Sequence, residues 1–459
     1  MGTPEAGAEA RRYGRSATLL ATGIGIGGIL TYLYFALASH NLSRVDYGQI
    51  VVLWSLVIVT VSIVDRPVEQ LLSRTIAERQ ERRQPIGRPL RVAALIQLGI
   101  ALTVAVVFLA LRVPLEDHLF DGKTTLYWVL LVAVVCYGAS YYARGFLAGT
   151  RRFGLLAGLI MNESLGRFLF ALAVAVGIAS GQTAIAIGVA ASPLLSLIVV
   201  PLAFVGGSRA QAHSDPATKP AIQSEEPEFT LASGGGFAAA VFLVMLSEQT
   251  FMNGGPLLIR GTAGAAAAGY IFNVIMVARA PLLLFQGIAT SLLPHLTRLR
   301  SRGQSGDEAF RLSIRGTMLA IAAFASAVSI VLLIAGPQLM QLAFGDKFTY
   351  DRVGLLCVSI GMGLYLAAAT LNQAAVAQGQ VRRAAARWVI VAAGFIVFNL
   401  LPILSDFRRV EVGFLAAAAV LSALLYALYR HPVARPSDAV EPGSPAEIEA
   451  RLAAAEEAG

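Results

Sequence analysis

The stretch "GGSRAQAHSDPATKPAIQSEEPEF", residues 206–229, is polar and rich in Pro, Ser and acidic residues within a chain that is otherwise strongly apolar. This composition is typical of a linker between two folded units. Of the 459 residues, 56% are hydrophobic and only 14% are charged, and the mean hydropathy is +0.68. Soluble domains carry about 25% charged residues. The composition therefore indicates an integral membrane protein.

Twelve apolar runs, six on each side of this linker, are long enough to cross a bilayer as helices. A hydrocarbon core of about 30 Å requires roughly 20 apolar residues per helix, and continuous runs favour helices over barrel strands. We predict an all-α integral membrane fold with twelve transmembrane helices in two six-helix lobes. The predicted spans are 16–38, 48–71, 92–112, 126–146, 155–179, 183–205, 233–255, 266–293, 312–335, 353–375, 385–404 and 410–429. The predicted domains are an N-terminus (1–15), an N-lobe (16–205), a linker (206–232), a C-lobe (233–429) and a tail (430–459).

Basic residues set the predicted orientation. Of the 36 Lys and Arg residues, 25 lie in or beside the N-terminus, the even-to-odd connections and the tail, and 8 lie beside the odd-to-even connections. Lys and Arg accumulate on the cytoplasmic side of membrane proteins. We therefore expect a multi-pass protein of the cell inner membrane with both termini cytoplasmic. The net charge of +8 reflects this bias and does not indicate a nucleic-acid partner.

Signatures of catalysis and of cofactor binding are absent from the sequence. There is no GxxxxGK[ST] loop, and the glycine run "GIGIGG" at 23–28 lies within an apolar span with no preceding strand. The five His residues show no metal-ligand spacing, and both Cys residues fall within predicted helices. We expect a transporter and not an enzyme, with no metal and no cofactor.

Charged residues inside the apolar spans are the candidate functional residues, because each costs roughly 2.5–3.5 kcal/mol at a helix centre. The stretch "MNESLGRFLF", residues 161–170, places Asn162, Glu163 and Arg167 in the fifth span. Arg167 and Arg279 lie about 18–20 Å along their helices, one in each half of the chain. Guanidinium groups match phosphate oxygens in pairs. These four residues are the predicted substrate contacts, although Glu163 and Arg167, four apart, also fit a self-neutralising pair.

Two further groups of charged residues lie within or at the end of the apolar spans. Glu248, in the seventh span, has no sequence-local partner, so we predict either an ion-coupling site or a pair with an Arg of the other lobe. Asp65, Arg66 and Glu69 lie near the cytoplasmic end of the second span, where snorkelling and local pairing suffice. We predict a gating or structural role for them. Pro281 predicts a break in the eighth span.

Four local stretches resemble the polysaccharide flippases of the multidrug/oligosaccharidyl-lipid/polysaccharide exporter superfamily. They are "LSRVDYGQI" (42–50), "RGFLAGTRRFGLLA" (144–157), "APLLLFQGIATSLLPHLTRL" (280–299) and "LAFGDKFTYD" (342–351). The lipid II flippase branch is similar around the last two stretches, but it typically has extra C-terminal helices. A chain of twelve predicted helices therefore fits the oligosaccharide branch.

The resemblance implies a V-shaped, alternating-access transporter. Such a flippase moves a polyprenyl-pyrophosphate-linked oligosaccharide from the inner to the outer leaflet, and Arg167 and Arg279 would contact its pyrophosphate or acidic sugars. The implied partners are this lipid-linked substrate, membrane lipids, and a polysaccharide polymerase or glycosyltransferases. Two alternatives remain open: a cation-coupled small-molecule exporter of the same superfamily, and a non-transport scaffold of a glycan-synthesis complex.

Overall fold

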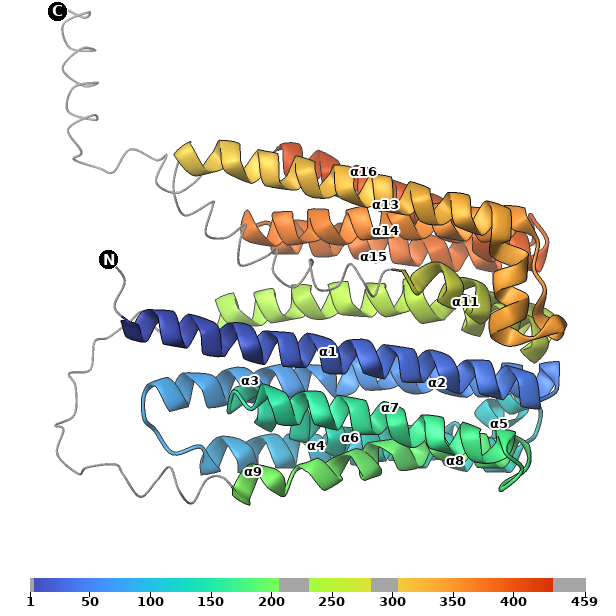
Figure 1. The fold of residues 1–459 in the computed structure, drawn as a ribbon, viewed down its shortest axis with the longest axis horizontal. Coiled ribbons are helices and arrows are strands. Elements are labelled where there is room, and N and C mark those ends of the chain that lie inside the picture. Colours follow the sequence, from blue (N-terminus) through green and yellow to red (C-terminus); the bar gives the residue numbers. More distant parts are fainter. Residues whose placement is uncertain (1–3, 206–230, 282–303, 432–459) are drawn as a thin grey trace, which may run out of the picture.

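The computed structural model describes residues 4–205, 231–281 and 304–431, which are almost entirely helical and contain no strand. The N-lobe comprises α1 (Pro4–Asn41), α2 (Arg44–Val64), α3 (Arg66–Glu81), α4 (Gly87–Ala110), α5 (Arg112–Phe120), α6 (Thr124–Gly149), α7 (Phe153–Ala175), α8 (Gly181–Ser196), η1 (Leu197–Val199) and α9 (Leu202–Val205). The C-lobe comprises α11 (Leu231–Arg279), α13 (Gln304–Phe344), η3 (Asp346–Phe348), α14 (Arg352–Ala377), α15 (Val381–Leu400) and α16 (Asp406–Arg430). The two lobes lie side by side as helix bundles, and α1 of the N-lobe faces α11 of the C-lobe (Figure 1).

The described residues contain eleven helical segments that are long and apolar enough to cross a membrane. One of them, Ala239–Arg279, reverses direction at Gly264, whose backbone is non-helical (φ 85°, ψ 178°). A Cβ placed on Gly255 would lie 3.4 Å from Ile275 and 3.5 Å from Ile271, so the two limbs of α11 pack against each other. Positive φ is readily adopted only by glycine. The hairpin adds a second helical limb to α11, and the described residues confirm the predicted all-α architecture of two lobes.

Several helix boundaries differ from the sequence prediction: α1 begins before residue 16, and the predicted sixth span over 183–205 is divided into α8, η1 and α9. The second span was predicted as one helix over 48–71, but the chain is helical from Arg44 to Glu81 with a break at Asp65, two residues before Pro67. The ninth span was predicted over 312–335, but α13 is longer at both ends. Hydropathy marks only the part of a helix that lies in lipid, whereas the helix continues where its polar residues meet water or protein. The predicted continuation of the eighth span to residue 293 lies outside the described residues.

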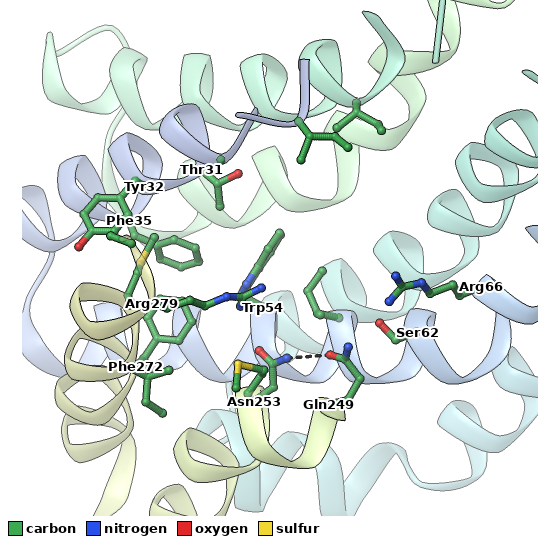
Figure 2. A pocket seen from close by; sticks show the side chains of 18 of the residues that line it. Thr31, Tyr32, Phe35, Trp54, Ser62, Arg66, Gln249, Asn253, Phe272 and Arg279 are labelled. Carbon is green, nitrogen blue, oxygen red and sulfur yellow. Dashed lines mark hydrogen bonds between the residues drawn. The ribbon is translucent and has the colours of Figure 1, made fainter. Parts of the chain in front are cut away.

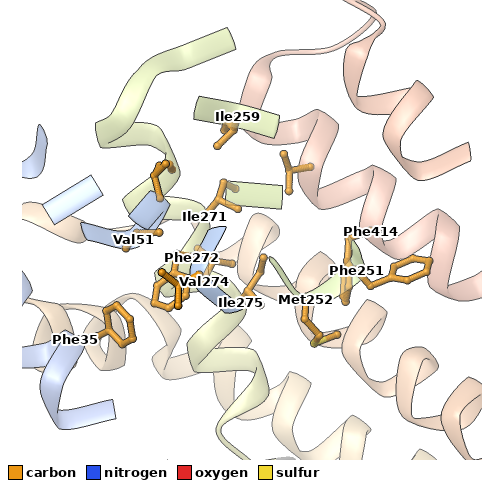
Figure 3. Packing of buried hydrophobic residues seen from close by; sticks show 14 of the residues in the cluster. Phe35, Val51, Phe251, Met252, Ile259, Ile271, Phe272, Val274, Ile275 and Phe414 are labelled. Atoms are coloured by element: carbon orange, nitrogen blue, oxygen red, sulfur yellow. The ribbon is translucent and has the colours of Figure 1, made fainter. Parts of the chain in front are cut away.

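Aromatic rings form the centre of the C-lobe. Phe251 of α11 lies 5.6 Å from Phe395 in a stacked arrangement and 5.9 Å from Trp388 in an edge arrangement, measured between ring centroids. Phe414 of α16 packs on the same ring, as Figure 3 shows. Aromatic pairs of this geometry contribute about 0.5–1.5 kcal/mol beyond area burial. They fix the first limb of α11 against α15 and α16, so this limb forms a rigid wall.

Small residues bring α3 and α6 close together in the N-lobe. A Cβ on Gly145 would lie 2.9 Å from the Glu69 carbonyl oxygen, and one on Gly149 would lie 2.8 Å from the Ser73 carbonyl oxygen. Glycine permits such approach between membrane helices because it has no side chain. This contact sets Glu69 on α3 beside Arg144 on α6.

The two lobes touch at one end of the bundle, which carries the turns after α1, α5 and α15. We call it the outer end, following the orientation predicted from the basic residues, and the opposite end the inner end. Arg260 of the C-lobe forms a salt bridge of 2.7 Å with Asp121 of the N-lobe. Lys347 donates to the Leu42 carbonyl oxygen at 3.2 Å, and the Tyr47 hydroxyl donates to the side-chain oxygen of Asn273. The outer end is therefore closed.

Candidate functional site

A cavity of about 600 Å³ lies between the lobes, on the inner side of the closed outer end. Figure 2 shows its polar wall: Arg66 and Arg279 reach into it from different lobes, and Asn253 donates to Gln249 at 2.9 Å across one turn of α11. The lining comes from five helices of the N-lobe and both limbs of α11: Leu20, Ile24, Gly28, Thr31, Tyr32, Phe35, Trp54, Ile58, Ser62, Arg66, Glu69, Tyr141, Arg144, Leu156, Ile160, Gln249, Met252, Asn253, Phe272, Ile275, Met276, Arg279 and Ala280.

The charges that line the cavity are predominantly positive. Arg66, Arg144 and Arg279 are cationic, and Glu69 is the one acidic residue among the described lining. Glu248 stands close enough to interact electrostatically with both Arg66 and Arg279. A concave surface with low-dielectric walls and an excess of one charge concentrates ligands of the opposite charge. The described lining of the cavity therefore carries an excess of positively charged side chains.

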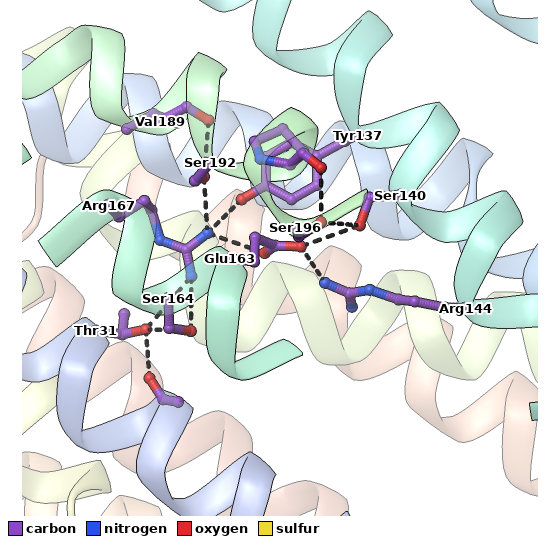
Figure 4. Close-up of polar contacts among 12 residues, drawn as sticks. Thr31, Tyr137, Ser140, Arg144, Glu163, Ser164, Arg167, Val189, Ser192 and Ser196 are labelled. Atoms are coloured by element: carbon purple, nitrogen blue, oxygen red, sulfur yellow. Dashed lines mark hydrogen bonds and ion pairs between the residues drawn. The ribbon is translucent and has the colours of Figure 1, made fainter. Parts of the chain in front are cut away.

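Arg167 and Glu163 are not among the described residues that line this cavity. They contact two residues that do line it, since Arg144 donates to Glu163 and Arg167 donates to Thr31 (Figure 4). Arg167 is 3% exposed and Glu163 is 4% exposed. The Arg167 guanidinium donates to the Tyr137 hydroxyl at 2.6 Å and to Glu163 at 2.9 Å. It also lies 4.7 Å from the ring centroid of Trp54, which does line the cavity. In this state Arg167 supports the wall and does not face the space inside it.

Glu163 joins the buried pair to the cavity through a second arginine. Arg144 lines the cavity and donates to Glu163 at 2.5 Å, while its guanidinium lies 4.4 Å from the centroid of the Tyr141 ring. Arg144 was not predicted as a site residue, because it lies within three residues of the cytoplasmic end of the predicted span 126–146 and was counted with the cytoplasmic connection. In the structure α6 continues to Gly149. The "RGFLAG" stretch at 144–149, quoted above only for its resemblance to the flippases, is the sequence signal that could have drawn attention to Arg144.

The other predicted site residues fall at different positions. Asn162 is half-buried on α7 and is not among the described residues that line the cavity. Asp65 is 2% exposed and accepts a hydrogen bond from Gln97 of α4 at 2.5 Å. Arg66 and Glu69 line the cavity. In the described part of the chain, no group of three or more His, Cys, Asp or Glu residues is placed to hold a metal ion.

An apolar groove of about 520 Å³ adjoins the cavity. It is bounded by α1, the inner end of α11 and α13, and it shares Tyr32 and Ala280 with the cavity wall. Its remaining described lining is aliphatic: Val277, Pro281, Ala327, Val328, Val331, Leu332, Leu339, Leu342 and Ala343. A polar, cationic space and an apolar groove therefore meet at Tyr32 and Ala280.

Comparison with solved structures identifies the fold. The chain is similar to the inward-facing form of a multidrug resistance MATE family transporter of the MOP superfamily, with 11% identity, a TM-score of 0.67 and coverage of 88% of this chain and 94% of that chain. It is also similar to the outward-facing form of a multidrug resistance MATE family transporter, with 12% identity and a TM-score of 0.59. That match covers 90% of this chain and 94% of the other chain. The eukaryotic MATE transporter AtDTX14 matches with 13% identity, a TM-score of 0.60 and coverage of 91% and 95%. Neither a protein-family model nor a curated protein sequence matches the chain.

The chain therefore has the fold of the MATE transporters, an all-helical membrane fold of two lobes. The superfamily of these structures is the one that the sequence motifs resemble. Sequence identities of 11–13% support a shared fold and nothing finer. The assignment to the polysaccharide-flippase branch therefore stays a prediction.

Proposed function

We propose that this chain is an alternating-access exporter that carries an anionic substrate through the cavity between its lobes. The observation that carries the proposal is the set of three arginines, Arg66, Arg144 and Arg279, against one lining acid, Glu69. Arginine binds phosphate, sulfonate and carboxylate oxygens through paired donors. A cavity for organic cations would need the opposite balance. A non-transport scaffold would need no such cavity between separable lobes.

The neighbouring structures favour a small-molecule exporter, because those whose descriptions name an activity are multidrug transporters. The apolar groove favours the second candidate, a flippase for a lipid-linked oligosaccharide. In that mechanism the phosphate sits on the arginines while the lipid chain lies in the groove beyond Tyr32 and Ala280. Both candidates use the same cationic cavity. They differ in whether the groove is needed.

Arg279→Ala should weaken uptake of an anionic probe into the cavity. Removing one charge-assisted hydrogen bond of about 1.5–3 kcal/mol lowers affinity roughly tenfold to hundredfold, and Arg279→Lys should recover part of it. The measurement is transport of a sulfonated rhodamine dye in proteoliposomes, with ethidium as the cationic counterpart. Arg315→Ala, an exposed change on α13, is the control and should leave transport unchanged. Transport of ethidium without the sulfonated dye would overturn the anionic assignment.

Ala327→Trp separates the two candidates, because a large ring at this position fills the apolar groove and leaves the arginines in place. For a flippase, leaflet transfer of a fluorescent polyprenyl-pyrophosphate oligosaccharide should be lost while transport of the sulfonated dye is retained. Transfer of the lipid probe is read from its accessibility to an external quencher. Wild-type protein that moves the dye but not the lipid probe would leave the small-molecule exporter as the function.

A further inference from the structure

A strongly cationic segment joins α3 to α4 at the inner end of the N-lobe, away from the cavity. Residues 82–92, "RRQPIGRPLRV", contain four arginines and no acidic residue. The four side chains are all exposed: Arg82, Arg83, Arg88 and Arg91. Neither the cavity nor the apolar groove includes any of them among its described lining. The proposed transport mechanism therefore leaves this segment without a role.

The acidic residues nearest to this segment in the sequence do not neutralise it. Glu78 is paired with Arg74 at 2.7 Å, and Glu81 is paired with Arg151 at 2.5 Å. Among the described residues, none of the four arginines of residues 82–92 forms a salt bridge. Their positive charges are therefore available to an anionic partner.

The connection that carries these arginines is an ordered turn. The Arg79 guanidinium donates to the Pro85 carbonyl oxygen at 3.2 Å, and the backbone N–H of Gln84 donates to the Arg79 carbonyl oxygen at 2.8 Å. Figure 1 shows this connection between α3 and α4, at the end of the bundle opposite α5. The turn thus holds the arginines beside the first turn of a membrane-spanning helix.

Arg88 and Arg91 lie on the side of α4 that faces away from the protein. The buried residues of α4 are Pro89, Ala93 and Gln97. At 3.6 residues per turn, the opposite side of the helix carries both arginines and a row of leucines. Each of these leucines is about two-thirds exposed: Leu95 (69%), Leu98 (67%) and Leu102 (65%). One stripe of α4 therefore begins with two cations and continues as an apolar surface.

This sequence of charge and apolar surface matches one amphipathic molecule. Guanidinium groups bind phosphate oxygens through paired donors, and clusters of four to eight basic residues beside a transmembrane helix attract anionic lipids. Acyl chains cover the exposed leucines of a helix that spans a bilayer. A zwitterionic lipid carries its own cation beside the phosphate, so it gains less from the arginines than an anionic lipid does.

We propose that the start of α4 is a binding site for an anionic phospholipid of the inner leaflet. The phosphate lies on Arg88 and Arg91, with Arg82 and Arg83 adding to the positive field, and an acyl chain follows the leucine stripe. This site is independent of the transported substrate, because it lies outside the cavity and the groove.

The site is tested with a tryptophan placed on the stripe, Leu98→Trp, in the full chain reconstituted into bilayers. Position 98 lies about 10 Å along the helix from Arg91, at the depth of bromine atoms in the middle of an acyl chain. Quenching by brominated phosphatidylglycerol is compared with quenching by brominated phosphatidylcholine, after subtraction of the signal of the native tryptophans. We expect phosphatidylglycerol to be preferred, and each arginine replaced in Arg88→Gln, Arg91→Gln should lower this preference about fivefold.

The matched control is Arg74→Gln, Arg151→Gln in the same Leu98→Trp background. It removes two positive charges from the same end of the same lobe, but these belong to exposed pairs with Glu78 and Glu81. The preference for phosphatidylglycerol should persist in this variant. An equal loss in both double variants would show a general charge effect and refute the site. Equal quenching by the two lipids with all arginines present would mean that another partner, such as the acidic linker, occupies the arginines, and the proposal would be wrong.

Discussion

Glu163→Ala should destabilise the N-lobe by about 3–5 kcal/mol, the loss expected when one partner of a buried ion pair is removed. The side chain of Glu163 accepts from Arg144 at 2.5 Å, from Arg167 at 2.9 Å and from the Ser140 hydroxyl at 3.2 Å. Removing it leaves two guanidinium groups without a carboxylate behind the wall of the cavity. The lost carboxylate, and not a lost contact area, is the source of this effect.

The same geometry predicts an order among the variants. Arg167→Ala should be milder than Glu163→Ala, because Glu163 keeps Arg144 as a counter-charge. Glu81→Ala breaks the exposed pair with Arg151, also 2.5 Å long, and should cost less than about 1 kcal/mol. The measurement is unfolding of the purified protein in mild detergent, followed by circular dichroism. Equal stability of Glu163→Ala and Glu81→Ala would show that the buried network contributes nothing to the fold.

The fold could be predicted from the sequence because the bilayer imposes a simple rule on the chain. A span must be helical and about 20 apolar residues long to satisfy its backbone in lipid. Six such runs on each side of the 206–229 linker led directly to two lobes. The reversal at Gly264 was also visible as a gap between the seventh and eighth spans. The breaks within helices were less predictable, since Asp65 and Pro67 interrupt a run that hydropathy treats as continuous.

The site was predictable only in part, because depth along a helix does not determine which way a side chain points. The sequence placed Arg167 and Arg279 near the middle of their helices. In the structure Arg279 lines the cavity, whereas Arg167 is enclosed by Tyr137, Glu163 and Trp54. Helix rotation and neighbouring helices decide this difference, and neither is encoded in a single hydropathy profile. The hydrogen bond between Asp65 and Gln97, 32 positions later, could not be predicted for the same reason, because it depends on how neighbouring helices pack.

Gly48→Ala should drive the protein out of the closed-outer state. A Cβ on Gly48 of α2 would lie 1.8 Å from the carbonyl oxygen of Ala265 and 2.3 Å from its carbonyl carbon, at the start of the second limb of α11. The obstacle is backbone, which cannot rotate aside as a flexible side chain does. Gly269 faces the same contact, because its Cβ would lie 3.3 Å from the Cα of Gly48. The lobes can accommodate the added methyl only by separating at this end.

The expected result is a shift of population rather than unfolding, because Gly48 and Ala265 belong to different lobes, and the lobes can move apart while the helices of each lobe stay folded. Overpacking a tight contact costs about 1–3 kcal/mol, occasionally more, and every 1.4 kcal/mol moves an equilibrium about tenfold. Spin labels at Val113 and Ile403, which are exposed on different lobes at the outer end, should report a longer distance in Gly48→Ala than in wild type. Transport of the sulfonated dye should fall to background.

The control for this change is Gly99→Ala on α4, where a Cβ would meet nothing within 4 Å. Alanine is the better helix former, so this variant should be neutral or slightly more stable and should keep the wild-type distance. If the distance between the spin labels in Gly48→Ala equals that in wild type, α2 and α11 make room for the methyl group without a movement of the lobes. Dye transport at the wild-type rate in a Gly48→Ala protein with a lengthened distance would mean that closure of the outer end is not a step in transport. With a long distance and no transport, closure at Gly48 and Ala265 becomes the step that returns the empty cavity to the inner side.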